Sequence, residues 1–443
     1  MDVTGVQQSL ERTATEAVEL ARSLGADEAE AGLSYDEGLS VTVRLGELES
    51  VERQRDRGLA ITVYVDGHKG SASTTRASRD ALEETAAKAL SIASFTAEDP
   101  YAGLADKQLM AREPRDLDLY HPWSLTVEVA ETLAKEAEDA ARATDKRITN
   151  SEGASVSTGG GVQVYANSHG FCGGYATSSH SLGCSVVAEG ENSLERDYWY
   201  TSSRDSGQLE QPQKVGVESA ERALRRLDAR QISTRQVPVI YPAELARGLF
   251  GYLVAAIRGT SQYRGASFLL DACGEQIFPD FIQIEEDPFI AGAMASAAFD
   301  NEGVATRSRT LVERGVLQGY VLSSYSARRL GLETTGNAGG VHNLVVSPTA
   351  GSLKEMLSDA GEVFLVGELL GQGVNTVTGD YSRGAAGFWV ENGEIAHAVN
   401  EVTIAGNLRD LFGGIRAVGS DIDLRGLVRC GSVLVEGLTV AGT

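Results

Sequence analysis

A carboxylate, a phenol and a guanidinium are crowded into four positions of one glycine-rich segment. Asp380, Tyr381 and Arg383 lie between Gly379 and Gly384. Glycine lets a backbone approach a bound molecule closely, and a guanidinium can grip a carboxylate through two parallel N–H groups. The segment is therefore a candidate ligand-binding loop, although hairpin and β-bulge scaffolding would explain the same glycines equally well.

A second glycine-rich segment carries an isolated histidine. Asn337 lies in the run Gly336-Asn337-Ala338-Gly339-Gly340, and His342 follows two residues later. An adaptable turn beside an imidazole can place a polar ring against a substrate, so Asn337 and His342 are further candidates. The structural alternative is again a turn that joins two strands.

The local zinc motif of the common metallopeptidases is absent from the sequence. That motif needs two helical histidines on one face, with a glutamate directly after the first. None of the six histidines precedes a glutamate, and none lies four or five residues from another; they are His68, His121, His169, His180, His342 and His397. A site built from scattered ligands stays open at this point.

Other segments that resemble catalytic or phosphate-binding motifs are better explained as structure. Residues 178–181 (Ser-Ser-His-Ser) lack the flanking glycines of a nucleophile elbow and predict an exposed hairpin tip. The glycines of residues 158–161 lack the Lys-Ser/Thr of a P-loop and predict a turn. The acidic run Glu285-Glu286-Asp287 predicts a solvated face.

Composition limits the classes of function. The 443 residues are enough for about three domains. With 62 acidic against 39 basic side chains, the formal net charge is −23, which disfavours general binding to nucleic acid or anionic membrane. Four widely spaced cysteines predict buried free thiols and a cytoplasmic location. The most apolar stretch, residues 289–299, is far too short to span a bilayer.

The amino-terminal half has the pattern of two units, each with helices and a β-meander. Residues 1–97 read as a helix, alternating strands with a hairpin turn at Asp66-Gly67, and a second helix from about Arg79. Residues 98–122 contain three prolines and little periodicity, so we expect a linker. Residues 123–232 repeat the order, with a meander of short strands expected over residues 151–200.

The carboxy-terminal half, residues 233–443, has a β-rich pattern with one packed helix. A buried strand is expected at residues 238–241 and a helix at residues 243–258. Hairpin turns are expected at Arg314-Gly315, Asn392-Gly393 and Glu436-Gly437. The whole chain is therefore expected to be α+β, because strands and helices do not alternate with the period of a doubly wound sheet.

Several long segments of the sequence resemble the TldD/PmbA family. The clearest are Phe299-Asp300-Asn301-Glu302-Gly303-Val304, Gly371-Gln372-Gly373-Val374-Asn375 and residues 378–389. Further matches lie at residues 310–313, 325–328, 336–340, 391–395 and 404–408. The resemblance covers nearly the whole chain, is densest over residues 237–443, and favours the PmbA branch of the family, also called TldE.

This resemblance implies a cytosolic zinc metallopeptidase system with two kinds of subunit. The TldD-type subunit carries a His-Glu-x-x-x-His helix and a distant cysteine as zinc ligands. It pairs with a PmbA/TldE-type subunit in a heterodimer, and the pair degrades unstructured peptides and trims leader peptides from modified precursors.

The positions of this chain that match the zinc helix hold no zinc ligand. The metal motif would fall near residues 250–255, which read Phe-Gly-Tyr-Leu-Val-Ala. Instead, the i, i+4 spacing of Leu245, Leu249, Leu253 and Ile257 predicts a helix that packs through an apolar stripe. Cys430 falls near the position of the cysteine ligand in the catalytic branch, but a single soft ligand binds zinc weakly, so a structural thiol is expected.

The resemblance and the missing ligands together predict a non-catalytic PmbA/TldE-like subunit. We expect no cofactor in this chain and zinc in a TldD-like partner, with a self-dimer as the other possible assembly. The chain would help enclose a channel for unstructured peptides, lined by Asn337, His342, Asp380, Tyr381 and Arg383.

Two alternatives from other classes stay open. The first is a self-sufficient metallopeptidase that uses scattered ligands such as His342, His397 and Cys430. The second is a regulatory protein that binds a folded partner without proteolysis. A DNA-binding regulator is disfavoured because the net charge is −23 and the sequence has no basic stripe.

Overall fold

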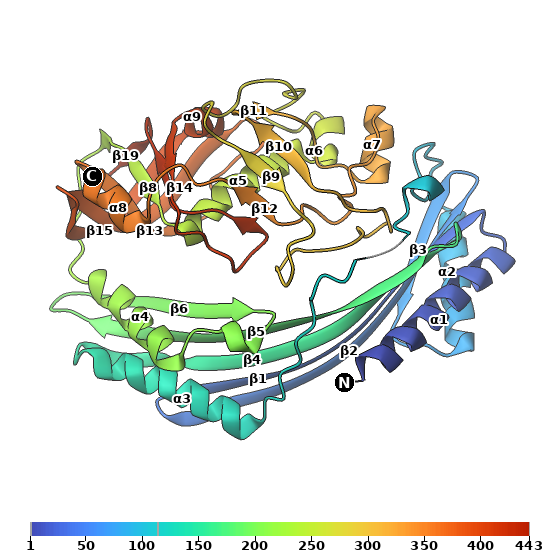
Figure 1. Ribbon diagram of the computed structural model, residues 1–443, viewed down its shortest axis with the longest axis horizontal. Coiled ribbons are helices and arrows are strands. Elements are labelled where there is room, and N and C mark those ends of the chain that lie inside the picture. Colours follow the sequence, from blue (N-terminus) through green and yellow to red (C-terminus); the bar gives the residue numbers. More distant parts are fainter. Residues whose placement is uncertain (1, 113–114, 443) are drawn as a thin grey trace.

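One long, curved antiparallel sheet forms the amino-terminal half of the molecule (Figure 1). The computed structural model describes residues 2–112 and 115–442. Within them the strand order of this sheet is β3-β2-β1-β4-β5-β6. The bounds are β1 Glu28–Arg44, β2 Glu47–Val65, β3 His68–Thr74, β4 Ile148–Asn167, β5 Cys172–Glu189 and β6 Leu194–Ser203.

The two predicted units share this sheet, because β1 of the first unit pairs with β4 of the second. Their antiparallel register runs from Glu30↔Asn167 to Val43↔Ala154. The hairpin at Asp66-Gly67 is confirmed, with φ angles of 48° and 76° joining β2 to β3. The expected meander of short strands is wrong, since β4 and β5 are 20 and 18 residues long.

The expected turn at residues 158–161 and hairpin tip at residues 178–181 are wrong, because both segments lie inside these long strands. Residues 158–161 belong to β4, where Gly161 lies opposite Asp36 of β1. A Cβ atom on Gly161 would lie 2.1 Å from a side-chain carboxylate oxygen of Asp36 and 3.0 Å from the Tyr35 carbonyl, so the glycine makes room for the neighbouring strand rather than forming a turn. Residues 178–181 lie in β5, where His180 is buried and shares a 2.8 Å hydrogen bond with the Thr158 hydroxyl.

Four helices pack on the convex face of the sheet through small side chains. Alanines dominate their buried faces, as in α3, where Ala130, Ala134, Ala137 and Ala141 are all fully buried. Small residues let helix backbones approach the sheet and one another closely. The bounds are α1 Val3–Ser23, α2 Arg79–Ala93, α3 Val127–Thr144 and α4 Pro212–Arg225.

Helices α3 and α4 approach each other closely at a glycine of α4. A Cβ atom on Gly216 would lie 2.0 Å from the carbonyl oxygen of Ala137 in α3. The α3–α4 pair therefore depends on a residue without a side chain at this point.

The carboxy-terminal half lies over the concave face and contains two sheets (Figure 1). One has the order β16-β18-β8-β13-β14-β15-β19-β7 and the other β11-β10-β9-β12-β17. The first has bounds β7 Arg235–Gln236, β8 Val239–Tyr241, β13 Val363–Leu370, β14 Asp380–Glu391, β15 Glu394–Asn407, β16 Ile415–Val418, β18 Val433–Val435 and β19 Thr439–Ala441. The second has bounds β9 Ile284–Glu286, β10 Arg309–Glu313, β11 Val316–Leu317, β12 Leu344–Val346 and β17 Val428–Arg429.

Helix α5 (Ala243–Ile257) contributes to one hydrophobic core with residues of both sheets. Leu249, Phe250 and Leu253 share that core with Phe364 of β13 and Leu344 of β12. The remaining helices are shorter: α6 Gly259–Tyr263, α7 Ser324–Leu330, α8 Leu353–Asp359 and α9 Leu408–Gly413. The predicted α+β class is confirmed.

Two of the three hairpins expected in this half are present. Arg314-Gly315 joins β10 to β11, and Asn392-Gly393 joins β14 to β15, with positive φ at all four residues. The expectation for Glu436-Gly437 is wrong, because β18 pairs with β8 and β16 whereas β19 pairs with β15 and β7. The glycine turns the chain, but the flanking strands find partners elsewhere in the sheet.

Buried or half-buried arginines connect the two halves. Arg204, just beyond β6, donates hydrogen bonds to the carbonyl oxygens of Ala293 and Met294 at 3.0 and 2.8 Å. Arg328 of α7 donates to the carbonyl oxygens of Gly103 and Leu104, in the connecting residues 98–122. These contacts hold the carboxy-terminal half over the concave face.

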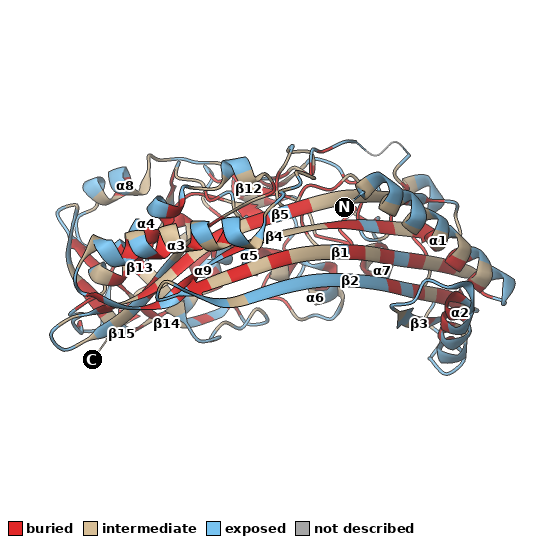
Figure 2. Cartoon of the chain, turned by 90° about the horizontal axis from the view of Figure 1, so that it is seen from below, coloured by how far each residue is buried: buried red, intermediate tan, exposed pale blue. Residues whose placement is uncertain are grey.

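The outer edge of β2 is exposed along much of its length (Figure 2). Within the described residues, β3 pairs only with Leu59–Val65, which leaves residues 47–58 bonded to β1 alone. Because side chains alternate along a strand, Arg53, Arg55 and Arg57 point to one face, and Glu52 and Asp56 to the other. This edge therefore carries a basic row and an acidic row.

Helices able to cross a lipid bilayer are absent from residues 2–112 and 115–442, since none of those described is both long and apolar enough.

Two interior helix glycines should respond oppositely to the same substitution. Gly216→Ala should lower the free energy of unfolding by about 1–3 kcal/mol, because the new methyl group would collide with the Ala137 carbonyl. Gly248→Ala in α5 should raise it by about 0.5–1 kcal/mol, because its Cβ meets no atom within 4 Å and alanine favours helix. Denaturant unfolding of the two variants measures both changes, and destabilisation of equal size would contradict this explanation.

Candidate functional site

Helix α5 is buried at the positions where a zinc motif would be expected. Phe250 and Leu253 have no exposed surface, and Val254 is 7% exposed. Phe250 stacks on Phe278 with ring centroids 6.3 Å apart. The predicted apolar stripe is confirmed, with Leu249, Leu253 and Ile257 in the core and Leu245 packed at its margin.

Beyond Glu244 of its first turn, which pairs with Arg222, the exposed side of α5 has almost no side chains. Gly248 and Gly251 are exposed and Ala255 is half-buried, so the helix offers mainly backbone on this side. Tyr252 is the large residue at its edge, and its hydroxyl accepts a 2.9 Å hydrogen bond from Nη1 of Arg383. Arg383 also donates from Nε to the Leu370 carbonyl at 3.1 Å.

Tyr381 and Arg383 come together beside α5, as their spacing along a strand requires. Both lie on β14, two residues apart and therefore on the same face. The ring of Tyr381 packs edge-on against Tyr252, and its hydroxyl accepts a hydrogen bond from Tyr241 at 3.4 Å. Burial raises the pKa of Tyr381 to about 12, so this phenol stays protonated at neutral pH.

Asp380 does not join this cluster. It is exposed at the start of β14, and its carboxylate accepts a 2.6 Å hydrogen bond from the Thr378 hydroxyl in the preceding turn. Strand alternation separates it from the face that carries Tyr381 and Arg383.

Asn337 and His342 meet around a buried carboxylate. Glu286 of β9 is 1% exposed and accepts hydrogen bonds of 2.7 Å from the Asn337 amide and the His342 backbone N–H. Its other oxygen accepts from Arg309 Nε at 2.7 Å, and Arg309 also donates to Asn337 Oδ1 at 3.0 Å. The expectation of a solvated face at residues 285–287 is therefore wrong for Glu286, because it points inward from its strand.

The His342 ring is half-buried and lies against the same glycine loop. Its Nε2 donates to the Gly336 carbonyl at 3.2 Å. Asn337 is 4% exposed and fully engaged in hydrogen bonds, so its role within this cluster is to fix the loop that carries His342.

The cysteines only partly match the expected buried free thiols. All four are free; Cys184 and Cys430 are buried, whereas Cys172 and Cys273 are exposed. Cys430 lies directly after β17, and burial raises the pKa of its thiol to about 12. The thiolate form that binds metals is therefore disfavoured at this position.

The candidate ligands of the self-sufficient alternative do not come together. His342 precedes β12 and Cys430 follows β17, at opposite ends of two parallel strands, while His397 lies on β15 in the other sheet. In the described part of the chain, no three histidine, cysteine, aspartate or glutamate side chains form a group that could hold a metal ion.

The residues of α5 do not fit the metal that a zinc helix would bind. At the matching positions stand a buried phenyl ring, two aliphatic side chains, a glycine, an alanine and a tyrosine already bonded to Arg383. None of these groups supplies an imidazole or carboxylate ligand.

Sequence reasoning missed four residues that organise these clusters. Tyr241 and Tyr252 support Tyr381 and Arg383, and Glu286 and Arg309 hold the loop of Asn337. The alternation of Ile284 and Glu286 on one face of a short strand was an available signal, since it places a glutamate where an apolar residue is expected.

Comparisons with known proteins place the chain beside one family over nearly its full length. Three family models match: "PmbA/TldA metallopeptidase domain 1" over residues 29–93, the central domain over residues 120–227, and the C-terminal domain over residues 234–442. The Metalloprotease PmbA of Escherichia coli O157:H7 is 49% identical over 440 residues, covering 99% of this chain and 98% of that protein. The PmbA homolog of Haemophilus influenzae is 46% identical, with 98% and 97% covered.

Solved structures share the fold. A candidate modulator of DNA gyrase from Bacteroides thetaiotaomicron has a TM-score of 0.93 and 28% identity, covering 98% of both chains. TldE from Thermococcus kodakarensis has a TM-score of 0.85 and covers 97% of this chain and all of that one; at 20% identity this likeness concerns the fold alone.

Loss of the buried Glu286–Arg309 ion pair should destabilise the fold far more than loss of an exposed ion pair of equal length. Glu286→Gln should lower the free energy of unfolding by about 3–5 kcal/mol, because Arg309 would keep a buried, unpaired charge. Glu436→Gln is the matched control: Arg416 and Glu436 are also 2.7 Å apart but about half exposed, so the loss should stay below about 1 kcal/mol. Denaturant unfolding measures both, and similar losses would show that burial does not set the strength of the pair.

Thiol reactivity should divide the four cysteines into two pairs. In the native chain at neutral pH, a thiol-specific chromogenic reagent should label Cys172 and Cys273, because both are exposed, with Cys172 the slower of the two since partial burial raises its pKa. Cys184 and Cys430 should react only after unfolding, since burial raises their pKa values to about 11 and about 12. Mass mapping of the labelled sites checks this, and rapid native labelling of Cys430 would contradict the structural role of its thiol.

Proposed function

Because the chain belongs to the PmbA/TldD family of metallopeptidases, we propose that it is the non-catalytic, PmbA/TldE-like subunit of a two-chain zinc metallopeptidase. Its partner would be a TldD-like subunit that holds the zinc. The pair would degrade unstructured peptides and trim leader peptides in the cytoplasm, and this chain would position the peptide.

The burial of α5 carries the proposal. A catalytic zinc helix has to direct two imidazoles and a carboxylate toward a substrate. Here the core side of the helix is filled by Phe250, Leu253 and Val254, and its exposed side carries Gly248 and Gly251. The side chains of this helix therefore suit packing against both sheets rather than binding a metal ion.

The residues beside α5 are suited to holding a peptide near that bare helix face. Arg383 uses Nε and Nη1 for internal hydrogen bonds, which fixes the plane of the guanidinium. Its Nη2 group then offers donors to a peptide carbonyl or a terminal carboxylate. Tyr381 and Asn337 are buried and position their neighbours, whereas the partly exposed His342 and the exposed Asp380 can contact a peptide.

The test combines this chain with a TldD-like subunit from the same host. We expect the two to co-purify and the complex to cleave a labelled unstructured peptide, with zinc bound to the partner. Neither chain alone should cleave it. Arg383→Ala in the complex should lower kcat/KM by about tenfold or more, the effect of losing one charge-assisted hydrogen bond.

Arg416→Ala provides the matched control, since Arg416 is an exposed arginine of the same half paired with Glu436. It should leave cleavage unchanged. Chelator-sensitive cleavage by the isolated chain would overturn the non-catalytic assignment. A stable complex that cleaves nothing would contradict the proposal and support the regulatory alternative.

A further inference from the structure

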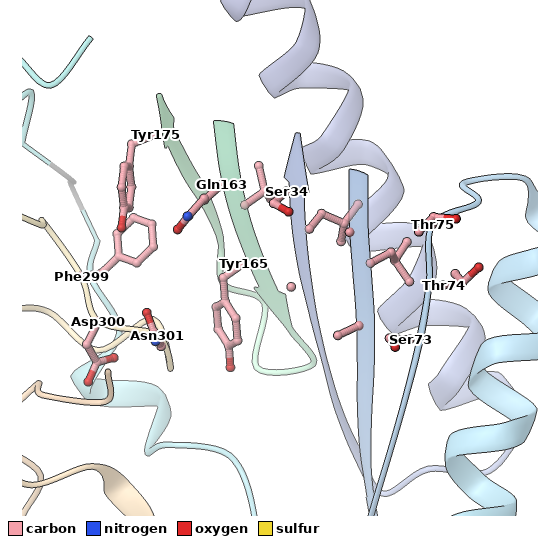
Figure 3. Close-up of a pocket in the computed structure, with 16 residues that line it drawn as sticks. Ser34, Ser73, Thr74, Thr75, Gln163, Tyr165, Tyr175, Phe299, Asp300 and Asn301 are labelled. Atoms are coloured by element: carbon pink, nitrogen blue, oxygen red, sulfur yellow. The ribbon is translucent and has the colours of Figure 1, made fainter. Parts of the chain in front are cut away.

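A separate cavity lies where the concave face of the long sheet meets the carboxy-terminal half (Figure 3). Its volume is about 660 Å³, within the range typical of ligand sites. Strands β1 to β5 and the loop of residues 299–301 contribute to its walls. No residue of α5 and none of the five channel candidates lines it.

One wall of the cavity is aromatic. Tyr175 of β5 packs edge-on against Phe299 with ring centroids 5.4 Å apart, and Phe171 supports Phe299 from behind at 5.2 Å. Tyr165 of β4 also lines the cavity, and its hydroxyl donates to Glu30 at 2.7 Å, which fixes the ring. Figure 3 shows Tyr175 and Phe299 close together at one side of the space. Such a wall favours a large apolar group.

The floor of the cavity is open because two strands carry glycine there. Gly32 of β1 and Gly58 of β2 both line the space. A Cβ atom on Gly32 would meet no other atom within 4 Å, so a side chain at that position would enter empty space.

Two amide side chains face the cavity from different elements. Gln163 comes from β4 and Asn301 from the loop beyond Phe299, and both are exposed. Neither side-chain amide makes a hydrogen bond within the described residues. An amide offers one acceptor and two donors, which match the C=O and N–H of a peptide group whatever the sequence of the peptide.

The charge around the cavity disfavours anions. No lysine or arginine is among the residues that line it. The carboxyl group of Asp300 accepts hydrogen bonds from the backbone N–H groups of Glu302, Val304 and Ala338 at 2.9–3.0 Å, and burial raises its pKa to about 7, so it supplies no positive charge and only part of a negative one at neutral pH. A phosphate-bearing ligand would therefore find no cation in the cavity to pair with.

We propose that this cavity binds one large apolar side chain of an extended peptide, with Gln163 and Asn301 bonded to the flanking peptide groups. The inference rests on the proposed function only in taking an unstructured peptide as the ligand. It adds a selectivity that the region beside α5 does not provide: segments with an exposed Phe or Leu are retained, and acidic segments bind weakly because the cavity offers their carboxylates no cationic partner.

The isolated full-length chain is sufficient for the test. Short fluorescent peptides of one polar sequence, with Phe, Leu, Ser or Glu at the central position, are titrated by fluorescence anisotropy. The Phe and Leu peptides should bind about tenfold or more tightly than the Ser peptide, as burial of such a side chain predicts, and the Glu peptide should bind most weakly. Equal binding of the Phe and Ser peptides, or no binding of the Phe peptide, would overturn the proposal.

Variants locate the binding at this cavity. Gly32→Leu should weaken binding of the Phe peptide about tenfold by filling the space, while Gly361→Leu, at an exposed glycine whose Cβ also meets nothing within 4 Å, should not. Asn301→Ala, at an exposed position, should weaken binding several-fold, and thermal unfolding verifies that each variant is folded. Unchanged affinity in both Gly32→Leu and Asn301→Ala would contradict the site.

These measurements need neither a partner subunit nor cleavage. If the isolated chain does not bind the peptides, the proposal of a two-chain peptidase is unaffected. If the complex does not cleave, the measured peptide binding to this cavity is unaffected.

Discussion

The carboxy-terminal half depends on the burial of a single helix between two sheets. Leu249, Phe250 and Leu253 of α5 contribute to a core that includes both sheets, and each side chain contributes about 1.5–3 kcal/mol by leaving water. A polar ligand at such a position would have to be buried without a partner or would force the sheets apart. Packing against the sheets and binding a metal ion are therefore competing roles for the same helix. In this chain the helix packs against the sheets.

Much of the fold follows from local patterns in the sequence. The apolar stripe of α5 has helical spacing, and Asp66-Gly67 and Asn392-Gly393 adopt the positive φ angles that their residue types favour. The exceptions are places where contacts between distant segments override local preference. Gly161 indicates a turn by composition, yet it lies within β4, where it pairs with Asp36 of β1 and Thr177 of β5.

In the candidate site, too, local patterns predict some of the contacts and the pairing of distant segments determines the others. Strand periodicity correctly brings Tyr381 and Arg383 to one face, but the residue that anchors Arg383 is Tyr252, which is 131 positions away in the chain. Glu286 and Asn337 are 51 positions apart in the chain. The local sequence around either residue does not indicate that it contacts the other. The segment Phe299-Asp300-Asn301 was recognisable as a motif, whereas the tyrosines that face it come from strands of the other half, which only the folded chain reveals.

The exposed edge of β2 has a consequence for behaviour in a crowded cell. Sheet edges of this length recruit other strands, and the outcome is aggregation. Side chains that lie directly opposite each other in a sheet share a face, so a second copy paired with residues 52–57 in the same face orientation would set arginine against arginine and carboxylate against carboxylate. These charge rows thus disfavour the pairing of two copies through their β2 edges in that orientation.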